Sequence, residues 1–370
     1  MNEVFIVEGQ CIVLDPGPEM IPPLSIMCPG FKVESVQPGP WFTPKFRELA
    51  KEEVILQRPL FELDFEGLRE AFFKKVPPLA KPDGEYKYSR LKLLHALSLN
   101  ELSHCRLCGW ECGINRFSGE KGKCGLDSQV FASDPFIHVA EESVINPALV
   151  TNLAGCSMRC IYCIASKTWD PENFNPLDTK TFWERIKDLM TEQIPINTIE
   201  FTNPTESLPG VIGLFASAPS DFNLPVVMNC HLYGSERFYE IAAPVTDIWL
   251  PDLRYGNDAC AKTLSKVDHY MEKARLGLEA MRKSGAKIVA RILVLPGHVS
   301  CCHEPALELL SGYKDCLWVS ILDQYIPEHE AHLDPDLSRR PTQEEFEKVR
   351  YLVGKCGLRN ILEDPKDFWK

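Results

Sequence analysis

The sequence predicts an α/β fold, a partial (β/α)6 barrel, on the basis of two observations. From residue 148 onward, six short apolar runs alternate with segments of helical periodicity, which is the pattern of a parallel sheet with helices outside it. A cysteine-rich loop directly follows the first run, at the strand end where α/β barrels place their active sites. Six strands suit an incomplete barrel that is open on one side for a large substrate.

The expected elements follow one another in βα units. The strands are expected at residues 148–153, 198–201, 225–228, 247–250, 287–295 and 317–322. The helices are expected at residues 178–193, 211–218, 236–243, 267–284, 304–310 and 343–355. Each expected helix follows one expected strand, which gives the six units of the barrel.

The chain is expected to divide into three parts. Residues 1–100 are rich in proline, which favours extended segments and turns over long helices, with one helical stretch at 65–75 as the exception. We expect this extension to be a packing or docking module without chemistry of its own. Residues 101–145 form a cysteine-rich metal-binding segment, and residues 146–370 form the barrel.

The composition argues against a protein that binds nucleic acid, spans a membrane or is secreted. The 370 residues are 45% hydrophobic, enough for at least one large core, and the formal charge of −12 disfavours nucleic acid as a partner, because phosphate binding needs a basic surface. No apolar run is long enough to span a bilayer, and the N-terminus does not resemble a secretory signal. A cytoplasmic location is expected, where fifteen cysteines indicate metal clusters rather than disulfides.

Three cysteines carry the strongest chemical signal. Cys156, Cys160 and Cys163 are spaced so that each thiolate can hold one iron of a [4Fe-4S] cluster. Such a cluster normally takes four cysteines, so three leave one iron open to another molecule. The alternative is a structural zinc that takes its fourth ligand from elsewhere, although such sites usually contain a distant second pair of ligands.

A second group of cysteines precedes the barrel. It consists of Cys105, Cys108, Cys112 and Cys124, together with glycines that let the chain turn tightly around an ion. One interpretation is a closed zinc or iron site that holds the segment together. The other is an auxiliary iron–sulfur cluster that relays electrons.

The loop from Cys156 to Cys163 resembles the signature of the radical S-adenosylmethionine (SAM) superfamily, Cys-x3-Cys-x-aromatic-Cys, with Tyr162 in the aromatic position. Tyr162 is expected to help place SAM. The resemblance implies a radical SAM barrel in which SAM chelates the open iron. It also implies that an electron from the cluster cleaves SAM to a 5′-deoxyadenosyl radical. The electron would come from a donor such as flavodoxin or ferredoxin.

From about Leu102 to the C-terminus, the chain is similar to one branch of that superfamily. The branch contains the glycyl radical enzyme activases and, more closely similar, the uncharacterised proteins that are like pyruvate formate-lyase activating enzyme. Besides the two cysteine groups, the similar stretches are residues 250–258, 291–298 and 339–346. Asp252 and Arg254 take the place of an Asp-x-Lys pair that lies beside the methionine end of SAM.

Three more SAM-binding residues are implied by this resemblance. Arg291 would bind the SAM carboxylate, and the alternative is a structural ion pair with a barrel carboxylate. His329 would lie near the ribose or adenine, and Asn229 would hydrogen-bond the nucleoside. The alternatives for these two are a solvated loop histidine and an asparagine that caps a turn.

One stretch departs from the superfamily pattern. Radical SAM enzymes commonly carry Gly-Gly-Glu after the second strand, where it binds the methionine ammonium group. Residues 201–206 here read Phe-Thr-Asn-Pro-Thr-Glu. Thr202 and Asn203 offer oxygen atoms that would replace the missing glycines as partners of SAM.

Two adjacent cysteines, Cys301 and Cys302, follow the fifth expected strand. As catalytic residues, their thiols would donate a hydrogen atom to a substrate radical. They would otherwise bind a metal with His298 or His303, or simply pack at the start of a helix.

The sequence therefore predicts a radical SAM oxidoreductase that abstracts a hydrogen atom from a protein or peptide, in the manner of a glycyl radical enzyme activase. One alternative is an epimerase or rearrangement enzyme that acts on a small molecule and uses Cys301 or Cys302 as hydrogen donor. Another is an iron–sulfur carrier without catalytic activity.

Overall fold

The computed structural model describes residues 3–7, 10–14, 36–39, 41–73, 86–191, 194–363 and 365–369. Strands β1 (Glu3–Val7) and β2 (Gln10–Leu14) pair antiparallel near the N-terminus. Most of the prolines expected in the N-terminal extension, including Pro16, Pro18, Pro22, Pro23 and Pro29, lie outside the described residues.

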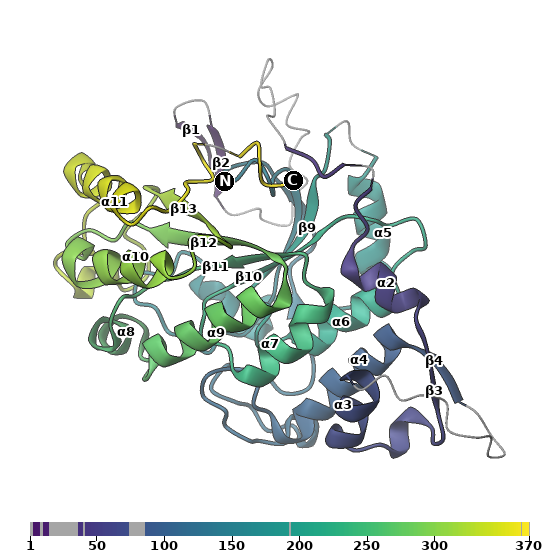
Figure 1. Cartoon of the computed structure of the whole chain (residues 1–370). Coiled ribbons are helices and arrows are strands. Elements are labelled where there is room, and N and C mark those ends of the chain that lie inside the picture. Colours follow the sequence, from purple (N-terminus) through teal and green to yellow (C-terminus); the bar gives the residue numbers. More distant parts are fainter. Residues whose placement is uncertain are drawn as a thin grey trace.

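The core of the fold is a seven-stranded sheet, and the six predicted barrel strands are confirmed within it (Figure 1). The parallel strands are β7 (Ala148–Asn152), β9 (Thr198–Thr202), β10 (Val226–Cys230), β11 (Ile248–Pro251), β12 (Lys287–Leu293) and β13 (Trp318–Leu322). They lie in chain order across the sheet. The short strand β6 (Phe136–His138) adds an antiparallel edge beside β7. The sheet is therefore mixed and curled into a half-barrel rather than wholly parallel.

Helices alternate with the strands, as the periodicity predicts. They are α5 (Thr179–Leu189), α6 (Leu208–Ala216), α7 (Glu236–Ala242), α8 (Asp258–Ser265), α9 (Tyr270–Ser284), α10 (Glu304–Ser311) and α11 (Gln343–Lys355). Figure 1 shows α6, α7 and α9 along one side of the sheet and α10 beside α11. Helix α8 is an addition to the prediction. It is separated from α9 by Lys266 and His269, whose positive φ angles of 60° and 55° interrupt helical geometry.

The interior of the half-barrel is apolar at the amino ends of the strands. Ala148, Val227, Ile248 and Val289 contribute to one buried cluster with Trp318, Phe368 and Trp369. The rings of Trp318 and Phe368 lie with their centroids 5.1 Å apart, and Trp369 Nε1 donates to the carbonyl of Val36 at 2.7 Å. The C-terminal segment therefore closes this end of the barrel, and the opposite end carries the polar residues.

The segment before residue 105 contains more helix than the sequence predicts. Besides α3 (Phe65–Phe73), it forms α2 (Lys45–Lys51) and α4 (Arg90–Asn100), with a hairpin of β3 (Glu53–Leu56) and β4 (Tyr86–Ser89). Helix α4 is stable because Ser89 caps its first turn and its leucines are buried against the barrel helix α6. The expectation of a single helix in residues 1–100 was wrong, because α2 and α4 lie in stretches without proline.

Candidate metal and cofactor site

The predicted site residues gather at the carboxyl edge of the sheet. Thr202, Asn229 and Arg291 lie within the strands β9, β10 and β12 themselves. The cysteine loop follows β7, Asn203 follows β9, Asp252 and Arg254 follow β11, the Cys301–Cys302 pair follows β12, and His329 follows β13. Because carboxyl ends of parallel strands share one edge, these residues face a common region.

The cysteine loop is held in place by its neighbours. The Sγ atom of Cys160 accepts a hydrogen bond from Ser265 Oγ at 2.9 Å, and that of Cys156 accepts one from Met158 N at 3.4 Å. The backbone of Ile161 pairs with Leu264 at the end of α8. Gly155 is required before the loop, because its φ is 82° and a Cβ atom there would lie 2.5 Å from the side chain of Leu126.

The pKa values of the thiols of Cys156 and Cys163 are raised. Burial raises the pKa of Cys156 well above its usual value, and the neighbouring Cys160 and Cys163 add to the shift. Burial and Cys160 raise the pKa of Cys163 to about 11, against an opposing contribution from Arg254. An iron–sulfur cluster would supply the missing positive charge, because metals bind the deprotonated thiolate.

Arg254 brings a positive charge to this loop. Its Nη2 donates to Asp252 Oδ2 at 2.8 Å. Burial alone would lower the pKa of Arg254, but Asp252 and the thiol of Cys160 outweigh it and raise the pKa well above its usual value. Its Nε is buried without a partner among the described residues, so this donor is available to a ligand.

Tyr162 points into the protein. Its hydroxyl lies 2.8 Å from the hydroxyl of Tyr255, which in turn contacts Ser265. Burial raises the pKa of Tyr162 above its usual value. This chain of hydroxyls leads back to Cys160 through Ser265, so Tyr162 supports the loop, and its contact with SAM stays a prediction.

Glu206 is a site residue that the sequence analysis did not select. It ends the Phe201–Glu206 stretch, is 1% exposed, and accepts hydrogen bonds from Ser157 N and Asn203 Nδ2, both at 2.9 Å. Burial alone would raise the pKa of Glu206, but His231 and Ser157 outweigh it and the pKa falls. The signal was present, because Glu206 stands where the superfamily pattern has its glutamate.

Asn203 in this stretch differs from Thr202 and from Asn229 of β10 in whether its polar atoms have partners. Asn203 has a positive φ of 54°, and its buried Oδ1 has no partner in the described structure. Thr202 Oγ1 and Asn229 Nδ2 contact Glu200 Oε1 at 3.3 and 2.8 Å. Asn203 therefore keeps an acceptor for a ligand, whereas Thr202 and Asn229 are engaged with a buried carboxyl group.

Arg291 forms a structural ion pair, which was the alternative to binding the SAM carboxylate. Its Nε donates to Glu142 Oε1 at 2.8 Å and its Nη2 to Glu142 Oε2 at 2.6 Å. Nη2 also donates to Glu141 Oε2 at 2.5 Å. Since two barrel carboxylates surround this guanidinium group, a contact with the SAM carboxylate stays a prediction.

His329 lies close to the segment that follows the cysteine loop. Its ring meets Trp169 edge-on, with centroids 4.8 Å apart, and the next residue, Glu330, donates its N–H to Ile161 O at 2.8 Å. Trp169 also carries the guanidinium group of Arg159 over its ring. The contacts place His329 beside the loop, while its role towards the nucleoside stays a prediction.

The four-cysteine segment lies directly against the cysteine loop. Cys156 N donates to Cys124 O at 3.3 Å, and Trp110 Nε1 donates to Ser157 O at 2.8 Å. Cys105, Cys108 and Cys124 are buried and Cys112 is exposed. Burial raises the pKa of Cys124 to about 11, and Glu206 adds to the shift. The carboxylate of Glu206 therefore acts electrostatically on the thiols of both groups.

Cys301 and Cys302 form a group with His298 and with Cys260, which the sequence analysis did not select. The ligand atoms of these four residues lie within 4.8 Å of one another, and no other group of this kind was found in the part of the chain that the structure describes. His303 is turned away, because its Nε2 accepts from Leu295 N at 2.9 Å.

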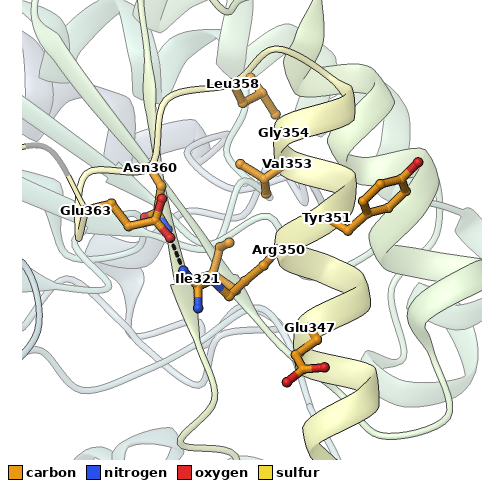
Figure 2. Close-up of a pocket in the computed structure, with 9 residues that line it drawn as sticks. All are labelled: Ile321, Glu347, Arg350, Tyr351, Val353, Gly354, Leu358, Asn360 and Glu363. Atoms are coloured by element: carbon orange, nitrogen blue, oxygen red, sulfur yellow. Dashed lines mark hydrogen bonds and ion pairs between the residues drawn. The ribbon is translucent and has the colours of Figure 1, made fainter.

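A pocket of about 380 Å³ lies elsewhere, between α11 and the segment after it (Figure 2). Figure 2 shows Arg350 paired with Glu363 across it. The remaining lining residues are Ile321, Glu347, Tyr351, Val353, Gly354, Leu358 and Asn360. None of them belongs to the predicted site.

The chain is similar in sequence to a protein of Methanocaldococcus jannaschii. No protein-family model matches it. It is 29% identical over 292 residues to the uncharacterized protein MJ0674 of Methanocaldococcus jannaschii, and the match covers 76% of this chain and 83% of that protein. No helix among the described residues is both long and apolar enough to cross a membrane.

Two solved structures of the radical S-adenosylmethionine methyltransferase TsrM from Kitasatospora setae are distantly similar. One, with cobalamin and a [4Fe-4S] cluster, gives a TM-score of 0.33 at 14% identity over 45% of this chain. The other, with tryptophan and a SAM analogue, gives 0.35 at 13% identity over 54%. The matches span 32% and 44% of the TsrM chains, less than half of their length.

Proposed function

We propose that the chain is a radical SAM enzyme in which Cys156, Cys160 and Cys163 hold a [4Fe-4S] cluster. The observation that carries the proposal is the position of this three-cysteine loop, at the carboxyl end of the first parallel strand of a half-barrel. When bound, such a cluster supplies the electron that cleaves SAM to a 5′-deoxyadenosyl radical, which abstracts a hydrogen atom from the substrate. A cluster with three cysteine ligands keeps one iron for SAM.

The surrounding residues fit a ligand at this position. Arg254 brings a cation with a buried, unpartnered Nε, and Asn203 brings a buried, unpartnered Oδ1. A guanidinium donor suits the carboxylate of SAM, and an amide oxygen suits its ammonium group. In this proposal Arg254 and Asn203 orient the methionine end, while Glu206 fixes Asn203 and the backbone of Ser157.

We also propose that the four-cysteine segment holds an auxiliary iron–sulfur cluster rather than zinc. In a tetrahedral zinc site with Zn–S bonds of about 2.3 Å, the sulfur atoms lie about 3.8 Å apart. In a cluster each thiolate instead binds a different iron, so the sulfur atoms are spaced more widely. Its backbone contact with Cys156 suits electron relay from a donor protein.

The first experiment tests for a radical SAM enzyme. After anaerobic reconstitution with iron and sulfide, the chain should release 5′-deoxyadenosine from SAM in the presence of dithionite. Cys156→Ala should lose iron and this product, whereas Cys356→Ala, on a partly buried cysteine at the end of α11, should keep both. A fully loaded cluster without product would favour the iron–sulfur carrier, and unchanged iron in Cys156→Ala would overturn the assignment of the ligands.

The substrate class is proposed to be a protein or peptide, as for a glycyl radical enzyme activase. An extract from cells grown on deuterated amino acids should enrich 5′-deoxyadenosine in deuterium. The enrichment should disappear when macromolecules are removed from the extract by filtration. Enrichment that stays with the filtrate would instead support a small-molecule substrate.

A further inference from the structure

A compact group of three cysteines and one histidine lies at the carboxyl edge of β11 and β12. The Sγ atom of Cys301 is 3.9 Å from the Sγ atoms of both Cys260 and Cys302. The Nδ1 atom of His298 lies 3.3 Å from Cys301 Sγ and 3.9 Å from Cys260 Sγ. All four potential ligand atoms fall within 4.8 Å of one another, so they converge on one point.

The four distances of 3.3 to 3.9 Å are close to the ligand spacings of a tetrahedral metal site. Zinc binds cysteine sulfur at about 2.3 Å and histidine nitrogen at about 2.0 to 2.1 Å, which places tetrahedral ligands about 3.5 to 3.8 Å apart. We propose that Cys260, His298, Cys301 and Cys302 bind one zinc ion in a closed Cys3His site. Each thiol loses its proton to solvent as the ion binds, and all four positions of the metal are then filled by the protein.

The local backbone is built to bring these ligands together. His298, Cys301 and Cys302 lie in or beside the π-helical turn Val299–His303, in which Cys302 N and His303 N both donate to His298 O. Turns of this type are rare and frequently occur at functional sites. Gly256 lets the preceding strand's loop approach the turn closely, because a Cβ atom there would lie 2.2 Å from Cys302 O.

Asn257 contacts both Cys260 and the Cys301–Cys302 pair. Its Nδ2 lies 2.6 Å from Cys301 O, 3.3 Å from Cys260 Sγ and 3.7 Å from Cys302 Sγ. Its Oδ1 accepts from Cys260 N at 2.8 Å and so begins α8. Three thiolates around a divalent ion leave one net negative charge, and amide donors near the sulfur atoms stabilise that charge.

A closed site of this kind has a structural consequence for the cysteine loop. Cys260 lies near the start of α8, and the end of the same helix contacts the loop through Ser265 Oγ and Leu264 O. Zinc would therefore attach α8 to the turn after β12 and fix the helix that carries the hydrogen-bond donor of Cys160. The zinc site itself does not depend on the proposed radical chemistry.

The test is the metal content of the full chain and three variants. After expression with added zinc and removal of loose metal with a chelator, elemental analysis should find a zinc ion that X-ray absorption assigns to three sulfur ligands and one nitrogen. Cys301→Ser and Cys260→Ser should weaken zinc binding by more than about a hundredfold, since even outer partners of metal ligands contribute 10- to 100-fold. Cys356→Ser should keep the zinc.

Separate controls test whether the variants fold and whether the zinc is bound at this site. Cys301 is exposed, so Cys301→Ser removes a ligand with little disturbance of packing, and its circular dichroism should match the parent. Cys156→Ala should lose cluster iron and keep this zinc, so failure of the two proposals can be told apart. The inference would be overturned if both ligand variants kept the zinc, or if Cys108→Ser lost it instead. A Cys260–Cys301 disulfide in protein isolated without oxygen would also overturn it.

Discussion

The hydroxyl oxygen of Ser265 lies 2.9 Å from the sulfur of Cys160, and this contact joins the end of α8 to the cysteine loop. Hydrogen bonds to ligand sulfurs raise the reduction potential of an iron–sulfur cluster, because they stabilise the added electron. Ser265→Ala should therefore make the cluster potential more negative by on the order of tens of millivolts, where 59 mV is tenfold for one electron. Redox titration followed by electron paramagnetic resonance measures this.

The matched control for Ser265 is Ser311→Ala, which removes a hydroxyl on α10 that donates to Glu308 O at 2.7 Å. Its potential should equal that of the parent chain. Equal potentials for Ser265→Ala and Ser311→Ala at equal iron content would show that the hydroxyl of Ser265 does not act on a cluster.

Arg254 is expected to bind the carboxylate of SAM. Loss of a hydrogen bond to a charged group costs about 1.5 to 3 kcal/mol, so Arg254→Gln should weaken SAM binding roughly 10- to 100-fold at unchanged iron content. Arg254→Lys should fall in between, since lysine keeps the charge without the planar fork. Anaerobic calorimetric titration with SAM measures this, with Arg350→Gln in the remote ion pair with Glu363 as control. Parent-like affinity in Arg254→Gln would rule out the contact.

The barrel could be predicted from sequence because its signals are local. Strand and helix periods alternate from residue 148, and buried strands such as β11 read as continuous apolar runs. Helix α4 was missed because its leucines are buried against α6, a contact with a distant segment. Helix α8 was missed because it is short, and its start depends on the cap from Asn257.

In the candidate site as well, local features could be predicted from the sequence, and contacts between distant segments could not. The three-cysteine loop is contiguous, so its spacing is visible in the sequence. Cys260 meets Cys301 only because β11 and β12 are neighbours in the sheet, and the sequence separation hides that. Arg291 was assigned to a ligand because nothing in the sequence places Glu142 opposite it.

The ion pair of Arg291 with Glu142 is expected to stabilise the fold. Glu142 is fully buried, and removing one partner of a buried pair costs about 3 to 5 kcal/mol because the other charge is left unpaired. Arg291→Met should therefore lower the free energy of unfolding by about that amount. Arg291→Met with Glu142→Leu should recover part of it, because Glu141 also loses its ion pair with Arg291. Urea unfolding of the four chains in a double-mutant cycle measures the coupling. Weaker SAM binding in Arg291→Met at unchanged stability would favour the cofactor role instead.

Asp247 makes the stability of the barrel depend on pH. This carboxyl group, before β11, accepts hydrogen bonds from Val226 N at 2.9 Å and Lys45 N at 3.1 Å, yet burial raises its pKa to about 7. Because the pKa is higher in the folded chain than in the unfolded chain, the protonated carboxyl group contributes to the free energy of unfolding. This contribution is complete below the unfolded-chain pKa near 3.8 and is lost as the pH rises towards 7. Asp247→Asn carries no such charge. The free energy of unfolding of Asp247→Asn should therefore increase relative to that of the parent by about 1.4 kcal/mol for each pH unit between pH 4 and 7.

Urea unfolding at pH 5, 6 and 7, with equal metal loading of all chains, measures the dependence on Asp247. The control is Asp178→Asn at the start of α5, where hydrogen bonds from Thr181 N and Oγ1 hold the pKa of the carboxylate below its usual value. Asp178 is ionised in both folded and unfolded chains over this range, so Asp178→Asn should keep a constant offset from the parent. A constant offset for Asp247→Asn as well would show that Asp247 stays ionised, and that its two backbone donors offset the cost of burying the charge.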